Sequence, residues 1–118
     1  KFDNNADFAS DTFTAPVAGK YQFNACVRFD DMDTDTFERI ELRIVTSNNT
    51  FYPAQSSGTI YETQSLTGAL TLNGSVLADM DASDTATVQV VVRGGTKTVD
   101  IFGDAAAHST FFTGNLEN

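Results

Sequence analysis

Carboxylates are the most abundant chemically active side chains in this chain, and six of them fall in two short segments. The six are Asp31, Asp33 and Asp35 in the first segment, and Asp79, Asp81 and Asp84 in the second. Oxygen ligands of this type suit calcium. The first segment is not an EF-hand, because no glycine follows Asp35 and the twelfth loop position is Leu42. The commoner role of such a charge run is a solvated, negatively charged turn, and calcium binding is the alternative.

Nucleophilic or metal-assisted catalysis has few residues to use in this sequence. The chain has one cysteine, Cys26, and one histidine, His108, which are far apart in the sequence. No Gly-x-Ser-x-Gly motif or histidine cluster accompanies them. We interpret Cys26 as an inert, structural thiol and His108 as a residue of a solvated loop or a subunit contact. The expectation is therefore that the protein is not an enzyme and has no cofactor, with calcium at an acidic turn as the alternative.

Three aromatic residues, Phe51, Tyr52 and Tyr61, lie outside the clearest strand patterns and are candidates for binding. Aromatic rings on loops can stack on sugars or anchor a protein interface. The alternative is that they cover a sheet edge or lie in a subunit contact. Tryptophan, which sugar-binding modules favour, is absent.

The composition limits the partners that the chain can have. Its 118 residues are enough for one domain, and the net charge of −9 repels nucleic acids and anionic lipid surfaces. No apolar run is long enough to cross a bilayer, so we expect no membrane insertion. From the length, we expect residues 1–118 to form a single domain. Because the chain starts with Lys1 rather than Met, we expect this domain to be the C-terminal head of a longer chain.

The elements that must position these residues are β-strands. Every odd position from Tyr21 to Phe29 is apolar or aromatic, and Ile40, Leu42 and Ile44 alternate with charged residues. This period of two predicts half-buried strands. The same alternation predicts further strands at 66–72, 85–93, 99–101 and 112–116.

Turn-rich stretches separate the predicted strands. They cover Asp30–Thr36, Ser47–Thr50, Gln55–Thr59, Asn73–Gly74, Asp79–Asp84, Gly94–Gly95 and Gly103–Ser109. Strands spaced in this way are typical of a sandwich or jelly roll. If loop ends alternate as in a jelly roll, the Asp79–Asp84 turn and the Gly103–Ser109 loop lie at one end, opposite the Asp30–Asp35 loop.

The segment Phe13–Phe23, with an aromatic residue, Pro16 and then Gly19-x-Tyr21-x-Phe23, resembles the central signature of the C1q-like and tumour necrosis factor-like family. Asp84–Val90 resembles the acidic turn and valine strand of that family, and Phe112–Leu116 resembles its closing strand. Two features depart from the pattern of the family. The spacing from Phe2 through Phe8 to Phe13 is shorter than in the usual signature, and Ala25 replaces an aromatic residue.

The resemblance implies an all-β, ten-stranded jelly-roll sandwich that assembles as a homotrimer and has no catalytic activity. Residues that would then serve the core or the trimer contact are Phe13, Tyr21, Phe23, Phe111, Phe112 and Leu116. The Thr-rich, Lys-poor composition of the chain is most similar to that of phage and bacterial members of this family. The expected function is a recognition head on a fibre or appendage, outside the cell or on a virion, that binds a cell-surface glycan or protein. The alternative is a decoration protein that binds other virion proteins.

Overall fold

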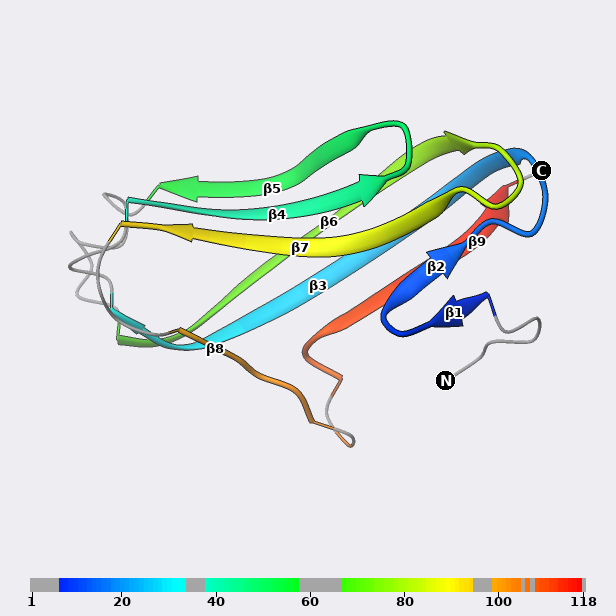
Figure 1. The fold of residues 1–118 in the computed structure, drawn as a ribbon. Helices are drawn as coiled ribbons and strands as arrows, with labels where there is room; N and C mark the ends of the chain where they lie inside the picture. Colours follow the sequence, from blue (N-terminus) through cyan, green and yellow to red (C-terminus); the bar gives the residue numbers. More distant parts are fainter. Residues whose placement is uncertain are drawn as a thin grey trace.

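The computed structural model describes residues 7–33, 38–57, 67–94, 99–104, 106 and 108–117. The described chain is all β, with nine strands and no helix, in two antiparallel sheets packed face to face as in a β-sandwich (Figure 1). The all-β prediction is confirmed. The described part of the chain contains no helix that could span a membrane.

The larger sheet has five strands and the smaller sheet has four. In order across the larger sheet, the strands are β1 (Phe8–Ala9), β2 (Thr12–Thr14), β7 (Thr85–Arg93), β4 (Arg39–Thr46) and β5 (Thr50–Ser57). In the smaller sheet, β3 (Gly19–Asp33) pairs on one side with β6 (Thr67–Met80), and on the other with β8 (Asp100–Ile101) and β9 (Phe111–Glu117).

The core forms where the inward faces of the two sheets meet. The odd residues of β3 from Tyr21 to Phe29 are all buried, as are Ile40, Leu42 and Ile44 of β4. Both alternation patterns therefore predicted the inward face correctly. Phe13 joins them from β2, with its ring centroid 5.3 Å from that of Tyr21 and 5.2 Å from that of Phe23. Such edge-to-face packing adds to the burial of the rings.

The turn predicted at Asn73–Gly74 is wrong, because both residues lie in the middle of β6, where they pair with Cys26 and Ala25. The glycine serves a close approach instead of a turn. A Cβ atom at Gly74 would lie 2.6 Å from the Pro53 Cβ of β5, in the opposite sheet. A glycine in a strand often marks such an approach of a neighbouring element.

The loop predicted for Asp30–Thr36 also needs correction. Strand β3 continues to Asp33, with a register shift between Phe29 and Met32, so Asp31 and Asp33 lie on a strand and not in a loop. Likewise, β5 continues through Gln55 to Ser57, where a turn was predicted. In both cases a neighbouring strand provides ladder partners, and polar composition alone does not end a strand that has them.

The loop between β8 and β9 is not at the end of the molecule where the Asp79–Asp84 turn lies. The Phe102 amide donates to the Arg28 carbonyl oxygen, and the Thr110 hydroxyl accepts from the Arg28 amide while donating to the Phe102 carbonyl oxygen. The Arg28 guanidinium also lies 4.2 Å from the centroid of the Phe102 ring. These contacts hold the two ends of the loop, at Phe102 and Thr110, beside Arg28 of β3.

Candidate functional site

The predicted binding residues Phe51 and Tyr52 lie inside β5, so their placement outside the strands was wrong. Phe51 packs against the core, whereas the Tyr52 side chain points outward and is 56% exposed. Tyr61 lies outside the described residues. Tyr52 is therefore the described member of the predicted aromatic set that is available to a ligand.

A bulge in β5 places Tyr52 beside Arg43. Leu42 pairs with Ala54 and Ile44 pairs with Phe51, so Tyr52 and Pro53 together lie opposite Arg43. An extra residue of this kind re-aims the side chains of its strand, and proline fits there because it has no amide hydrogen to donate. The Arg43 guanidinium carbon lies 5.2 Å from the centroid of the Tyr52 ring, a cation–π distance.

Glu41 is the anchor of a charge cluster on the outer face of the same sheet. Arg43 donates to Glu41 Oε2 from Nε and Nη2, at 3.0 and 2.6 Å. On the other carboxylate oxygen, Arg39 Nε lies 2.7 Å from Oε1, and Gln55 Nε2 donates to it at 3.4 Å. The Glu41 side chain is only 4% exposed. Both carboxylate oxygens are thus engaged by neighbours within the sheet.

The protonation of Glu41 follows from these contacts. The hydrogen bond from Arg43 lowers the pKa of Glu41, burial opposes this effect, and the charges of Arg39, Arg43 and Arg93 lower the pKa further. Glu41 is therefore a carboxylate at neutral pH. Its negative charge holds Arg39 and Arg43 in place on an otherwise open sheet face.

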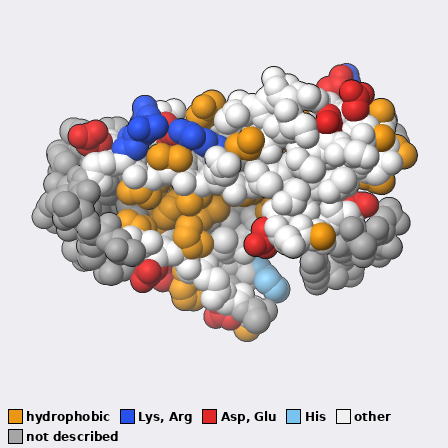
Figure 2. All heavy atoms as spheres, in the orientation of Figure 1, with side chains coloured by type: hydrophobic (Ala, Val, Ile, Leu, Met, Phe, Trp, Pro, Cys, Tyr) orange, Lys and Arg blue, Asp and Glu red, His pale blue; other side chains and the backbone are white. Residues whose placement is uncertain are grey.

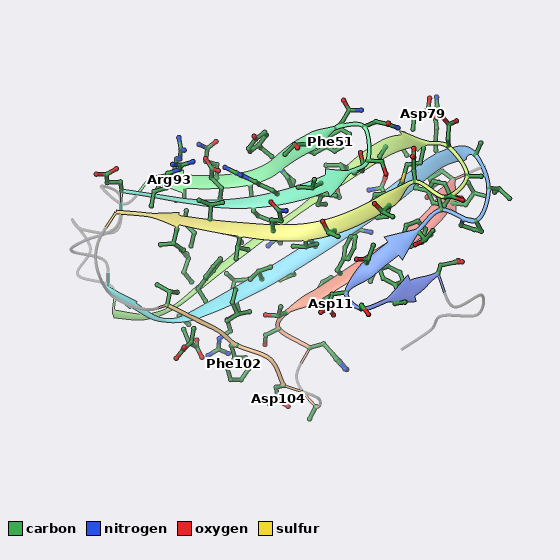
Figure 3. The ribbon with its side chains drawn as sticks, viewed as in Figure 1. Asp11, Phe51, Asp79, Arg93, Phe102 and Asp104 are labelled. Atoms are coloured by element: carbon green, nitrogen blue, oxygen red, sulfur yellow. The ribbon has the colours of Figure 1, made fainter. Side chains whose placement is uncertain are left out.

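Arg39 and Arg43 contact the Glu41 carboxylate. Arg93 acts on it through its charge. Arg93 of β7 pairs directly with Arg39 of β4, which places two like charges opposite each other. Figure 3 shows Arg93 near the end of the sheet, and Figure 2 shows the basic side chains gathered over this part of the surface. We call the surface formed by Arg39, Glu41, Arg43, Arg93, Gln55 and Tyr52 the arginine face. It carries an excess of positive charge in a protein whose net charge is −9.

The second predicted acidic site, Asp79, Asp81 and Asp84, is not assembled as a metal centre in the described residues. Asp84 Oδ2 instead accepts hydrogen bonds from the Asp81 amide at 2.9 Å and from Asn48 Nδ2 at 2.7 Å. His, Cys, Asp and Glu side chains form no group of three that could hold a metal ion in the part of the chain that is described. The side chains of Asp31 and Asp33, and the whole of Asp35, lie outside it, so calcium there stays a prediction.

The smaller sheet has an outer face of different chemistry. The central residues of β6, β3 and β9 that point outward are all uncharged: Gln22, Asn24, Cys26, Asn73, Ser75, Leu77, Phe111, Thr113 and Asn115. Leu77 is 53% exposed and Phe111 is 42% exposed. We call this surface the neutral face, because none of these nine residues is charged.

A groove of about 890 Å³ runs along β9, between this strand and the β1–β2 hairpin. Its walls include Phe8, Val88, Phe111 and Phe112, and His108 and Asp11 lie at its rim. His108 is exposed, which fits the predicted solvated loop, and the alternative of a subunit contact stays a prediction. Within the described residues β9 pairs with β3 alone, so the groove lies beside an open sheet edge.

The residues predicted to serve the core or a subunit contact divide into two groups. Phe13, Tyr21 and Phe23 are buried, and Phe112 packs against the core from β9. Phe111 and Leu116, which is 41% exposed, belong to the surface. The opposite parity predicted for Phe111 and Phe112 is confirmed. Cys26 lies on the outer side of β3, where its thiol is 3.4 Å from the Ser109 carbonyl oxygen.

Sequence reasoning missed the arginine face. The spacing of Arg39, Glu41 and Arg43 placed three charges on one side of a strand, and this was a usable signal. Arg93 could be added only once the pairing of β4 with β7 was known.

Comparison with known proteins assigns no family to this chain. A scan against protein-family models and a search of curated proteins each find no match. The chemistry of the two outer faces is therefore the basis for assigning a function.

Proposed function

We propose that this chain is a non-enzymatic, trimeric jelly-roll head that recognises a cell-surface glycan or protein. The observation that carries the recognition role is the exposed Tyr52 ring, which a strand bulge places against Arg43. Tyrosine and arginine are enriched among the residues that dominate binding energy at interfaces. A bulge that presents both on a sheet face suits a binding role.

The path of the chain supports the jelly roll. The connections from β2 to β3, β3 to β4, β5 to β6, β6 to β7 and β7 to β8 each pass from one sheet to the other. As a result, β7 lies between β2 and β4, and β3 lies between β6 and β9. Repeated crossing of this kind produces the Greek-key connections from which jelly rolls are built.

The neutral face supports the subunit contact. Interface cores are depleted of charged residues and enriched in aromatic ones, and this face carries exposed Phe111 with no charge at its centre. The groove along β9 continues the apolar surface around the sheet edge. A contact made here would leave the arginine face, on the other sheet, open to a ligand.

Sedimentation equilibrium at micromolar concentration tests the assembly. We expect the mass of a trimer for the parent, and dissociation for Gln22→Glu, because three copies would bring new charges onto the neutral face. Gln89→Glu is the matched control, since Gln89 is exposed on the other sheet. A parent that sediments as a stable monomer would overturn the trimer.

A binding array of glycans and surface proteins tests recognition. We expect reproducible hits that are lost in Tyr52→Ala, with an unchanged melting temperature because this side chain is largely exposed. Binding that is confined to an isolated particle shell, with no array hit, would favour the alternative role of a decoration protein.

A further inference from the structure

We infer that the arginine face binds a sugar that carries a carboxylate, as sialic acids and uronic acids do. This inference rests on the recognition role proposed above and names the class of ligand. It is carried by three features of the face: an excess of guanidinium groups over carboxylates among its described residues, a restricted extent of positive charge, and an exposed aromatic ring beside Arg43.

The first feature calls for an anion. Glu41 already accepts hydrogen bonds from Arg43 and Gln55 and contacts Arg39, so it has little capacity left to balance Arg93. Arg39 and Arg93 remain directly opposite each other, and like charges in that relation destabilise a sheet. An external carboxylate between them would relieve this repulsion, and guanidinium groups bind carboxylates through paired hydrogen bonds.

The second feature favours a small anion over a long one. Electrostatic interactions in physiological salt extend over about 8 Å, so a ligand that fits within the face experiences mainly the arginines. A polyanion would run beyond them onto a protein with sixteen acidic residues and seven basic ones. Nucleic acids and highly sulfated polymers are therefore poorer fits than a single carboxylated sugar.

The third feature favours a sugar over a simple carboxylate. One face of the Tyr52 ring lies toward Arg43, yet the side chain is still 56% exposed, so ring surface remains for the C–H groups of a pyranose. Gln55 is exposed on the same strand and has an amide that can hydrogen bond to hydroxyl groups. The combination of guanidinium, ring and amide matches the carboxylate, apolar face and hydroxyls of an acidic sugar.

The experiment is a calorimetric or NMR titration with two matched pairs of probes. The pairs are 3′-sialyllactose against lactose, and methyl glucuronide against methyl glucoside. We expect the carboxylated member of at least one pair to bind at least about tenfold more tightly, and the pair that shows the preference identifies the type of acid. A tenfold difference corresponds to about 1.4 kcal/mol.

Two substitutions that remove one positive charge each provide the control. Arg93→Gln is expected to weaken binding of the carboxylated probe at least about tenfold, whereas Lys20→Gln, on the opposite sheet, is expected to leave it unchanged. Both side chains are exposed, so neither substitution should lower the melting temperature, and any change for Arg93→Gln should be a rise, because the repulsion from Arg39 is removed. Equal weakening by the two substitutions would show nonspecific electrostatics and overturn the inference.

The failure of this inference differs from the failure of the proposed function. Equal binding of carboxylated and neutral probes, or array hits that survive Arg93→Gln, would overturn the acidic-sugar assignment and leave recognition standing. A chain that binds neither sugar pair nor any array member would overturn both.

Discussion

Gly114 of β9 and the Phe23 ring of β3 are in such close contact that no side chain fits between them. A Cβ atom at position 114 would lie 2.7 Å from Phe23 Cε1 and 2.8 Å from Cδ1, and Phe23 is fully buried. The clash involves a core ring that is packed on several sides, so it cannot be relieved by moving a flexible chain end.

We therefore expect Gly114→Ala to destabilise the fold by about 1 to 3 kcal/mol, the usual cost of overpacking a core. Gly103→Ala is the matched control, because a Cβ there meets nothing within 4 Å. Its effect should stay within about 0.5 kcal/mol. Urea denaturation measures both, and equal midpoints for the two variants would contradict the packing described for β9.

The Tyr21 hydroxyl closes the turn that leads into β3. It donates to the Val17 carbonyl oxygen at 2.7 Å and accepts from the Val17 amide at 3.4 Å. We expect Tyr21→Phe to cost about 0.5 to 1.5 kcal/mol, the range for a typical hydrogen bond, because the 3.4 Å bond from the amide is long and adds little to the 2.7 Å bond. Tyr52→Phe removes the same atom from an exposed ring and should change the free energy of unfolding by much less. Thermal and chemical denaturation of the pair would reveal any reversal of that order.

The lowered pKa of Glu41 makes part of the stability depend on pH. Because the folded state binds this proton more weakly than the unfolded chain, the contribution of Glu41 is present above its ordinary value of 4.5 and is lost as the pH falls through the lowered pKa. Glu41→Gln should therefore be most destabilising near pH 7, with a gap to the parent that narrows in acid.

Unfolding free energies of the parent and Glu41→Gln, measured between pH 7 and pH 3, test this expectation. The remaining carboxylates are common to both proteins, so the difference between the two curves isolates Glu41. Glu117→Gln, at a strongly exposed position, is the control. A gap that stays constant with pH would contradict the assigned role of the carboxylate.

Asp84 stabilises the turn between β6 and β7. In that turn Ser83 has a φ of 74°, a left-handed conformation that is costly for a residue with a side chain. The hydrogen bonds from the Asp81 amide and Asn48 hold the turn closed. Asp84→Ala should cost about 1 kcal/mol, and Asp79→Ala, at an exposed strand position, less than about 0.5. A larger loss for Asp79→Ala, measured by urea denaturation, would be incompatible with this arrangement.

The strands were predictable from the sequence because alternation is local information. The parity of Tyr21, Phe23 and Phe29 reports which side of β3 meets the core, whatever the partners of that strand are. Strand ends were less predictable, because pairing decides them. Asn73 and Gly74 have the composition of a turn, yet pairing with β3 keeps both residues inside β6, and Gly74 also allows the close approach of Pro53.

The candidate site was predictable only in fragments. Tyr52 could be singled out as an aromatic residue, but its outward direction depends on the bulge opposite Arg43, which is a property of the register between two strands. Arg93 meets Arg39 through pairing between segments that are distant in the sequence. No pattern within either segment contains that information.

The long ladder between β3 and β6 has a consequence for the order in which the protein can fold during its synthesis. Gly19 pairs with Met80 and Tyr21 pairs on its other side with Leu116, so β3 is made long before either neighbour leaves the ribosome. Contacts between such distant segments are slow to form. In the interval β3 is an unpaired, aromatic-rich strand with both edges open, the form in which a nascent chain is most exposed to aggregation.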